Sequence, residues 1–236
     1  ADTEAFVGAI YEASGRNMDT FMQNGNHDDD FSFALPGIGA SARTSSVSAF
    51  DGAVIRVIPF GLPDPAEFHI PDEVLRLAKF QKGLVLVTGP AGAGKSTTLA
   101  CIIDRLNHER SGHIITMETI EYVHKHGTCI VTQREVPTDV ATYSEALRSA
   151  MRESPDVILL GEMRDQDTIG TAVTAAEMAQ LLFSTLQHGA AGTVDRITLL
   201  PASQQRQIRI QLSMVLQAIV SQQLVPTVDG GTAPAF

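Results

Sequence analysis

A run of eight residues has the types and spacing of a loop that binds the phosphate groups of a nucleotide. It reads Gly89-Pro90-Ala91-Gly92-Ala93-Gly94-Lys95-Ser96, and Thr97 follows it. The glycines allow successive backbone N–H groups to point inward, and Lys95 can reach the β- and γ-phosphates. The Ser96 hydroxyl is expected to coordinate Mg²⁺, which takes few protein oxygens beside phosphate oxygens. This pattern predicts a site for a nucleoside triphosphate and Mg²⁺.

The segments on either side supply the strand, loop and helix that this motif requires. The apolar run Leu84-Val85-Leu86-Val87-Thr88 precedes the loop, and the stretch from Thr97 to Asn107 is compatible with a helix. The amino end of that helix adds the positive end of its dipole to the site. A glycine-rich turn that binds nothing is the alternative, and the complete motif in this context argues against it.

Two glutamates follow predicted strands and are candidates for catalysis. Glu118 comes after the strand His113–Met117, and Glu162 comes after the strand Val157–Leu160 and Gly161. Hydrolysis of the β–γ bond needs a positioned water and neutralised phosphate charge. Glu162 is therefore the candidate for polarising the water or organising the metal ion, with Glu118 beside it. An ordinary exposed glutamate at a strand end is the alternative for each.

Beyond Gly83 the apolar strands alternate with helical segments, a pattern typical of a mostly parallel sheet covered by helices. The sequence therefore predicts an α/β fold. Thr142 and Glu145 form a capping box at the start of one helix. A last long helix is predicted from Pro201 to about Gln222. The residues of its apolar stripe are Ile208, Leu212, Val215 and Ile219.

The amino-terminal part has a different character. Its first 26 residues are weakly helical, and two strands are predicted at Phe31–Leu35 and Ala53–Ile58. The acidic run that begins at His27 is compatible with a metal site, but adjacent acidic residues in a loop more often stay solvated. A proline-rich linker and a short helix that begins at Pro71 follow. The domain boundary is predicted in this linker.

Composition restricts the classes of function. The chain has 236 residues, a net charge of −10 and a pI near 5.1. This acidic balance argues against nucleic acid as a partner, because proteins that follow phosphate backbones usually show a basic excess. Cys101 and Cys129 lack metal-site spacing and indicate reduced thiols in a cytoplasmic protein. No apolar run approaches the roughly 18 to 20 residues that cross a bilayer, so no direct membrane insertion is expected.

Five blocks of the chain resemble the secretion ATPase superfamily of hexameric motors. They are Gly83 to Thr98, Gln133 to Val136, Tyr143 to Arg152, Pro155 to Asp165 and Ala172 to Thr185. Within this superfamily, Gly161 to Asp165 and Gln133 to Val136 most resemble the PilT-like retraction (twitching motility) ATPases of type IV pili. The resemblance implies a RecA-like P-loop ATPase domain after a partial, PAS-like α+β domain. The expected divisions are residues 1–60, PAS-like; 61–82, linker and short helix; and 83–236, ATPase domain without the family's helical C-terminal region.

The resemblance also implies a function and its residues. The chain is expected to be an ATP-hydrolysing motor for pilus retraction, working as a homohexamer in the cytoplasm and attached to the inner-membrane platform of the pilus machine. The loop Gly89 to Ser96, the Walker B-like Glu162 and the acidic-box Glu118 carry over by position. Arg56 matches an arginine of the amino-terminal domain that reaches a phosphate, and arginine suits that role because it is always charged. A plain strand arginine that pairs with a local acid is the alternative for Arg56.

Two short sequence motifs of the family, called the acidic box and the histidine box, differ in this chain. The acidic box reads Glu118-Thr119-Ile120-Glu121, one residue shorter than the usual Glu-Asp-Pro-Ile-Glu. In the histidine box, Gln187 stands where the family has histidine, and His188 comes one place late. Since the phosphate loop is complete, the sequence predicts good ATP binding with slow hydrolysis. Three alternatives follow: a pilus-extension or type II secretion ATPase, a weakly active accessory subunit of the same machine, and, disfavoured by charge, a nucleic-acid translocase.

Overall fold

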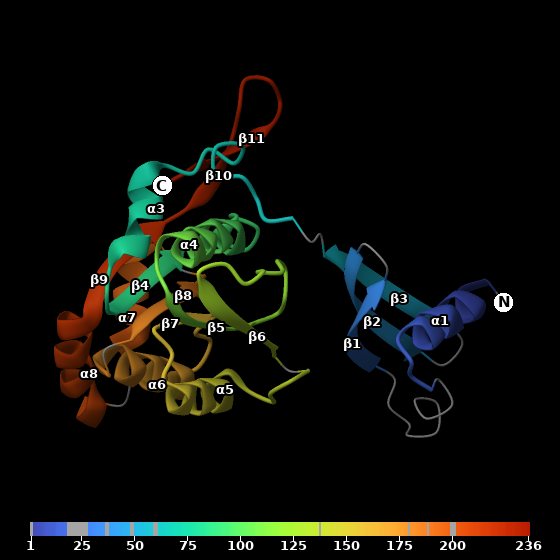
Figure 1. Cartoon of the computed structure of the whole chain (residues 1–236), viewed down its shortest axis with the longest axis horizontal. Coiled ribbons are helices and arrows are strands. Elements are labelled where there is room, and N and C mark those ends of the chain that lie inside the picture. Colours follow the sequence, from blue (N-terminus) through green and yellow to red (C-terminus); the bar gives the residue numbers. More distant parts are fainter. Residues whose placement is uncertain are drawn as a thin grey trace. The chain divides into compact units, whose positions relative to one another are not determined.

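The computed structural model describes residues 2–17, 28–35, 38–47, 50–58, 61–136, 138–178, 180–187, 189–198 and 202–236 (Figure 1). The chain divides into two compact units. The first contains Ala1–Gly61 and Glu121–Val123, and the second contains Leu62–Ile120 and His124–Phe236. The phosphate loop and both candidate glutamates belong to the second unit.

In its described residues, the first unit combines helix α1 with a three-stranded antiparallel sheet of order β1-β2-β3. Helix α1 spans Asp2–Ala13, and the strands are β1 (Asp28–Leu35), β2 (Ile38–Val47) and β3 (Phe50–Ile58). The two strands expected from the sequence lie within β1 and β3. The central strand β2 was not predicted from the residues, because its interior, residues 39–46, has Thr44 as its only β-branched residue and no aromatic residue. Of the acidic run, Asp28 begins β1, and His27 lies outside the described residues.

The second unit is built on a six-stranded sheet of order β6-β5-β7-β8-β4-β9. Every neighbouring pair in this sheet is parallel. The strands are β4 (Gly83–Thr88), β5 (Gly112–Glu118), β6 (Cys129–Glu135), β7 (Val157–Leu160), β8 (Leu181–Leu186) and β9 (Leu216–Ser221). The predicted α/β fold with a mostly parallel sheet is confirmed.

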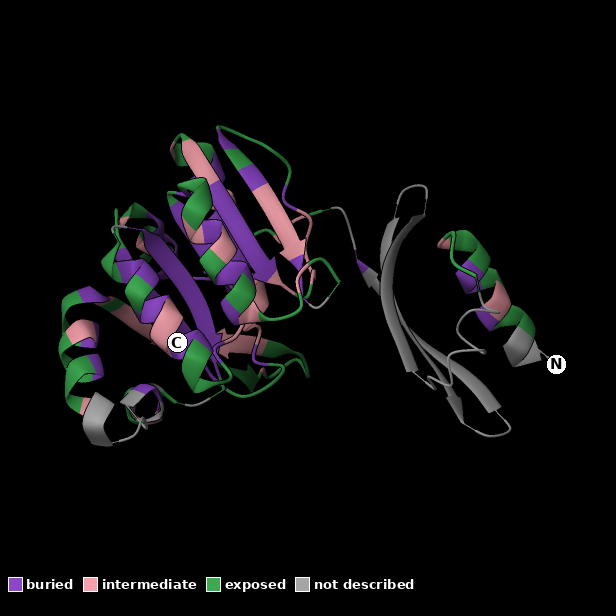
Figure 2. Cartoon of the chain, turned by 90° about the horizontal axis from the view of Figure 1, so that it is seen from below, coloured by how far each residue is buried: buried purple, intermediate pink, exposed green. Residues whose placement is uncertain are grey.

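Helices cover both faces of this sheet (Figure 1). The elements are α3 (Asp72–Leu75), the 3₁₀ helix η1 (Arg76–Lys79), α4 (Lys95–Glu109), α5 (Tyr143–Ala150), the 3₁₀ helix η2 (Met151–Glu153), α6 (Gln166–Glu177), α7 (Ala190–Thr198) and α8 (Ala202–Val215). One apolar cluster joins α3 and α4 to one face, and a second joins α5, α6 and α8 to the other. Figure 2 shows the inner strands as the buried centre of this unit, whereas the edge strands β6 and β9 are partly exposed, as are the outer surfaces of the helices.

Local sequence signals account for several boundaries. The Thr142 hydroxyl accepts a hydrogen bond from the Glu145 backbone N–H at 3.2 Å, as the capping box predicts, and α5 begins at Tyr143. The Asp165 carboxylate caps α6 in the same way, accepting from the Thr168 N–H at 2.8 Å. Each cap satisfies a backbone donor that the helix itself leaves unpaired.

The predicted last helix is wrong at its carboxyl end. Helix α8 ends at Val215, and Leu216–Ser221 form β9, which pairs in parallel with β4. Short apolar runs fit a helix or a strand equally well by periodicity. Here the exposed edge of β4 supplies backbone hydrogen bonds to an extended chain. An antiparallel hairpin that was not predicted follows, formed by β10 (Gln223–Pro226) and β11 (Thr232–Ala235).

Candidate functional site

The phosphate loop connects the end of β4 to the start of α4, as expected. Gly94 forms the N-cap of α4 in the left-handed conformation, with φ of +86°, and no side chain caps the helix. The first N–H groups of α4 therefore meet no capping side chain, and the positive end of the helix dipole lies at the loop. This arrangement suits an anion such as a nucleotide phosphate.

Lys95 folds back over the loop. Its ammonium group donates hydrogen bonds to the backbone carbonyls of Gly89 at 2.9 Å and Pro90 at 2.8 Å. These contacts keep the positive charge at the mouth of the loop, where phosphate oxygens can replace the carbonyls. Ser96 and Thr97 follow in the first turn of α4 and are partly buried. The hydroxyl of Ser96 is the type of hard oxygen donor that Mg²⁺ prefers.

The two candidate glutamates lie on neighbouring strands. Glu118 is the last residue of β5, and Glu162 follows β7, its partner in the sheet. Gly161 makes this approach possible, because a Cβ at that position would lie 2.7 Å from the Cβ of Glu118. The carboxyl ends of parallel strands meet at one edge of a sheet, which also holds the phosphate loop after β4. The structure therefore brings Glu118, Glu162 and the loop to the same edge.

Hydrogen bonds from the strand ends hold the turn that carries Glu162. The Gly161 N–H donates to the Met117 carbonyl at 2.8 Å, and the Thr185 hydroxyl donates to the Gly161 carbonyl at 2.6 Å. The Met163 N–H donates in turn to the Thr185 carbonyl at 3.2 Å. These hydrogen bonds join the carboxyl ends of β5, β7 and β8, and they fix the backbone on either side of Glu162.

Sequence reasoning did not identify two neighbours of these glutamates. Arg164 donates a hydrogen bond from Nε to the Glu162 carboxylate at 2.6 Å, and this contact raises the pKa of Arg164. Glu162 is only 16% exposed, whereas Arg164 is 67% exposed. Burial raises the pKa of Tyr143, whose phenol also interacts with the charges of Arg164, Glu118 and Glu162. The sequence places Arg164 two positions after Glu162, but it does not show that the Arg164 side chain points toward the Glu162 carboxylate.

Gln222 is a further contact of the loop that was missed. It is 2% exposed and follows β9. Its side-chain Oε1 accepts a hydrogen bond from the Thr98 hydroxyl at 2.8 Å, and its Nε2 donates to the Ala93 carbonyl at 2.8 Å. Gln222 and Thr98 are 124 positions apart, and the sequence pattern assigned Gln222 to the end of a helix. No local signal could have identified this contact.

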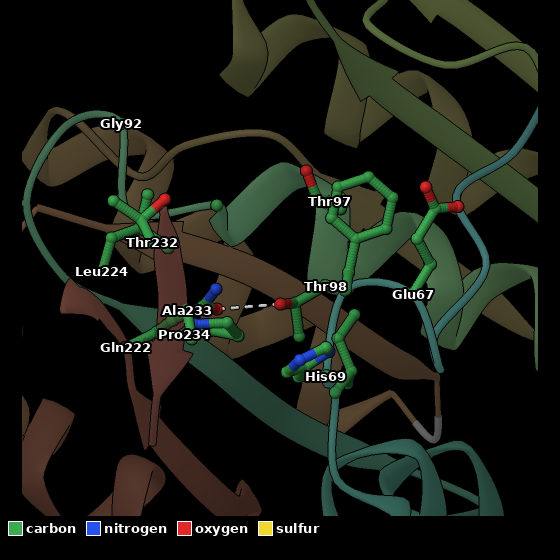
Figure 3. Close-up of a pocket in the computed structure, with 13 residues that line it drawn as sticks. Glu67, His69, Gly92, Thr97, Thr98, Gln222, Leu224, Thr232, Ala233 and Pro234 are labelled. Carbon is green, nitrogen blue, oxygen red and sulfur yellow. Dashed lines mark hydrogen bonds between the residues drawn. The ribbon is translucent and has the colours of Figure 1, made fainter. Parts of the chain in front are cut away.

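A cavity of about 450 Å³ opens beside the loop (Figure 3). Its walls come from the segment before α3, from the loop and α4, and from the carboxy-terminal hairpin. The lining residues are Glu67, Phe68, His69, Ile70, Gly92, Gly94, Thr97, Thr98, Gln222, Leu224, Thr232, Ala233 and Pro234. Its walls combine apolar side chains with a few polar groups, which is common in sites for small organic ligands.

The remaining predicted residues lie elsewhere. Arg56 belongs to β3 in the first unit, and its side chain is outside the described part of the chain. His188 lies outside the described residues. Gln187, which stands in the family's histidine position, is exposed directly after β8. The structure brings together the loop, Glu118 and Glu162, whereas the roles of Arg56 and His188 stay predictions.

Comparisons with known proteins support the resemblance. A family model described as "Type II/IV secretion system protein" matches residues 67–233. The chain is 47% identical over 214 residues to the "Type IV pilus retractation ATPase PilT" of Pseudomonas aeruginosa, a match that covers 87% of this chain and 61% of that protein. It is 45% identical over 210 residues to the "Twitching motility protein" of Neisseria gonorrhoeae, covering 87% of this chain and 56% of that protein.

A solved structure agrees with these relatives. The crystal structure of the pilus retraction motor PilT with bound ADP superposes with a TM-score of 0.86 at 45% identity, covering 92% of this chain and 64% of that one. The predicted resemblance to PilT-like ATPases is thereby confirmed. The chain spans about three fifths of the length of the curated relatives it matches. Among the described helices, none has the length and apolar character that a membrane span requires.

Proposed function

This chain belongs to the type II/IV secretion system protein family, and we propose that it hydrolyses ATP to power the retraction of a type IV pilus. The observation that carries the proposal is the complete phosphate loop, at the same sheet edge as two glutamates, in a fold shared with a pilus retraction motor. Its relatives at 45% and 47% identity are named for twitching motility and for pilus retraction.

In this proposal the triphosphate lies in the loop and the nucleoside lies in the neighbouring cavity. The ADP bound to the related PilT motor supports a nucleotide as the ligand. Lys95 exchanges its contacts with the Gly89 and Pro90 carbonyls for oxygens of the β- and γ-phosphates. Thr97 and Thr98 line the cavity and lie in the first turn of α4, so the cavity joins the phosphate site directly.

Glu162 is the proposed base or water-orienting residue, and Glu118 assists it. The Ser96 hydroxyl, with Glu162, is proposed to hold Mg²⁺, which neutralises charge on the phosphates when it is bound. The Glu162 carboxylate is paired with Arg164 in this structure, so it must leave that contact to act on water. Arg164 is 67% exposed, so water can solvate its guanidinium group when it leaves the pair.

We propose further that the active form is a homohexamer in the cytoplasm, attached to the inner-membrane platform of the pilus machine. The proposed domains are a partial PAS-like domain at residues 1–60, a linker at 61–82 and a RecA-like ATPase domain at 83–236. Arg56 of one subunit is proposed to act on the nucleotide of its neighbour, and His188 to sense the γ-phosphate. The symmetric rings that homo-oligomers commonly form would allow such shared sites.

A weakly active nucleotide-binding subunit of the same machine is a second candidate. The observation that favours it is Gln187, which replaces the family's histidine directly after β8. A group that acts only in the transition state changes kcat rather than affinity. This candidate therefore has the same ATP affinity as the motor but a much lower kcat.

The test is a Lys95→Ala variant, assayed for ATP binding and turnover together with the molecular mass of the assembly. We expect turnover to fall by about 100-fold or more, because Lys95 neutralises charge that develops on the phosphates. The matched control is Lys82→Ala, which removes an exposed lysine just before β4 and should leave turnover unchanged. Normal turnover in Lys95→Ala would show that the loop is not the active site.

A further inference from the structure

We propose that Gln222 is a positioning residue for the phosphate loop and joins that loop to the nucleoside cavity. The inference rests on the proposed function, because its readout is the binding of ATP. Gln222 leaves β9 at the edge of the sheet and enters the hairpin of β10 and β11. It is therefore the point at which the carboxy-terminal part of the chain meets the loop.

The side chain of Gln222 uses both ends of its amide. Its Oε1 accepts from the Thr98 hydroxyl at 2.8 Å, and its Nε2 donates to the Ala93 carbonyl at 2.8 Å. Figure 3 shows the contact with Thr98 at the wall of the cavity. The amide supplies both the acceptor and the donor that these two partners need, whereas a carboxylate only accepts and a methionine of similar length provides neither. The residue type is thus matched to its two partners.

The backbone of Gln222 adds two contacts on the other side of the loop. Its N–H donates to the Thr88 carbonyl at 2.7 Å. Its own carbonyl lies against Gly89, where an added Cβ would stand 3.1 Å from the carbonyl carbon of Gln222 and closer still to the oxygen. Gln222 therefore contacts four parts of the site. These are Thr88 before the loop, Gly89 at its start, Ala93 within it and Thr98 in the first turn of α4.

The contact with Ala93 bears directly on phosphate binding. The peptide unit between Ala93 and Gly94 is planar and trans, so its C=O and N–H groups point in opposite directions. Because Nε2 of Gln222 holds the Ala93 carbonyl, the Gly94 N–H must face the opposite side of that peptide, away from Gln222. An N–H held in this way costs no reordering when an anion binds.

Gln222 also lines the cavity, together with Leu224 from the strand that follows it. Nearly all of Gln222 is buried, at 2% exposed, so its hydrogen bonds form away from competing water. A change in the position of the hairpin would therefore move Gln222 and, through Ala93 and Thr98, the loop. Filling of the nucleoside cavity and the geometry of the phosphate loop are coupled through this side chain.

The test is a Gln222→Met variant, measured for the Kd of a fluorescent ATP analogue and for KM and kcat. Methionine keeps the length and fills the space but leaves the Thr98 hydroxyl and the Ala93 carbonyl without this partner. Loss of one buried partner commonly corresponds to a change of about tenfold in an equilibrium constant. We expect Kd and KM to rise about tenfold or more. Gln222→Glu should raise Kd at least as much as Gln222→Met, because a buried carboxylate would face the Ala93 carbonyl oxygen and would repel the bound phosphates.

The matched control is Gln180→Met. Gln180 is also buried, at 8% exposed, but it lies at the amino end of β8, away from the loop edge. Its variant should bind the ATP analogue as the wild type does. Thermal unfolding without nucleotide checks that the variants fold. If Gln222→Met does not fold, Thr98→Val provides the test, because it removes the same hydrogen bond from the other side and should also raise Kd.

The outcomes separate the two proposals. A folded Gln222→Met that binds the ATP analogue as tightly as the wild type overturns this inference alone. A wild-type chain that binds no ATP overturns the proposed function, and the inference with it. A raised Kd in Gln222→Met but not in Gln180→Met supports a role in positioning the loop. If Thr98→Val raises Kd less in the Gln222→Met variant than in the wild type, the two residues act through their shared hydrogen bond.

Discussion

Gly89→Ala is expected to destabilise the second unit strongly, although it adds a single methyl group. Gly89 has φ of +146°, a conformation that side-chain-bearing residues rarely adopt. The new Cβ would overlap the backbone carbonyl of Gln222. The backbone fixes the position of the Cβ, and the carbonyl is itself backbone, so neither can turn away as a flexible side chain could. The hydrogen bond from the Gln222 N–H to the Thr88 carbonyl, 2.7 Å long, holds the two segments together.

The size of the effect follows from these contacts. Forcing alanine into this backbone conformation costs about 1–3 kcal/mol. Separating the chains also weakens the bond between Gln222 and Thr88, at about 1 kcal/mol. The expected loss of unfolding free energy is about 2–4 kcal/mol. For a chain of this length, each kcal/mol lowers Tm by about 2–4 °C, so Tm should fall by about 4–16 °C.

Thermal unfolding followed by circular dichroism measures this change, and Gly170→Ala is the control. Gly170 lies within α6, and an added Cβ there meets no atom within 4 Å. That substitution should raise the unfolding free energy by about 0.5–1 kcal/mol, since alanine favours helix more than glycine does. Equal Tm values for Gly89→Ala and the wild type would refute the reasoning, as would a similar fall in Gly170→Ala.

Three further predictions concern catalysis and pH. Glu162→Gln should retain ATP binding but lower kcat by about 100-fold or more, and undiminished turnover would exclude the role proposed for Glu162. Gln187→His should raise kcat with little change in ATP affinity; if turnover stays flat while His188→Ala abolishes it, His188 already serves as the sensor. Burial lowers the pKa of His124 from 6.5 to about 4, so the folded chain binds fewer protons than the unfolded chain. As the pH falls from about 6.5 toward 4, protons bind the unfolded chain first, so the free energy of unfolding should decline by about 3 kcal/mol. Urea unfolding measures this decline, and it should be smaller in His124→Leu.

The sequence alone was sufficient where the signal is local. The phosphate loop is one continuous segment, so its strand, its turn and its helix could be predicted from residue spacing. The capping box at Thr142 was equally local, because its two partners lie within one helical turn. Glu118 and Glu162 are distant in sequence, but the rule that parallel strands end at one edge was enough to bring them together.

Other features depended on tertiary structure. The segment Leu216–Ser221 has a pattern compatible with helix, and it became a strand because the free edge of β4 pairs with its backbone. Arg164 pairs with Glu162 because the turn after β7 directs both side chains to the same place. Gln222 reaches the loop because β9 ends beside β4, across 124 positions of sequence from Thr98. A contact between residues so far apart in sequence depends on which strands become neighbours in the sheet. The order of the strands cannot be inferred from the spacing of residues along the chain.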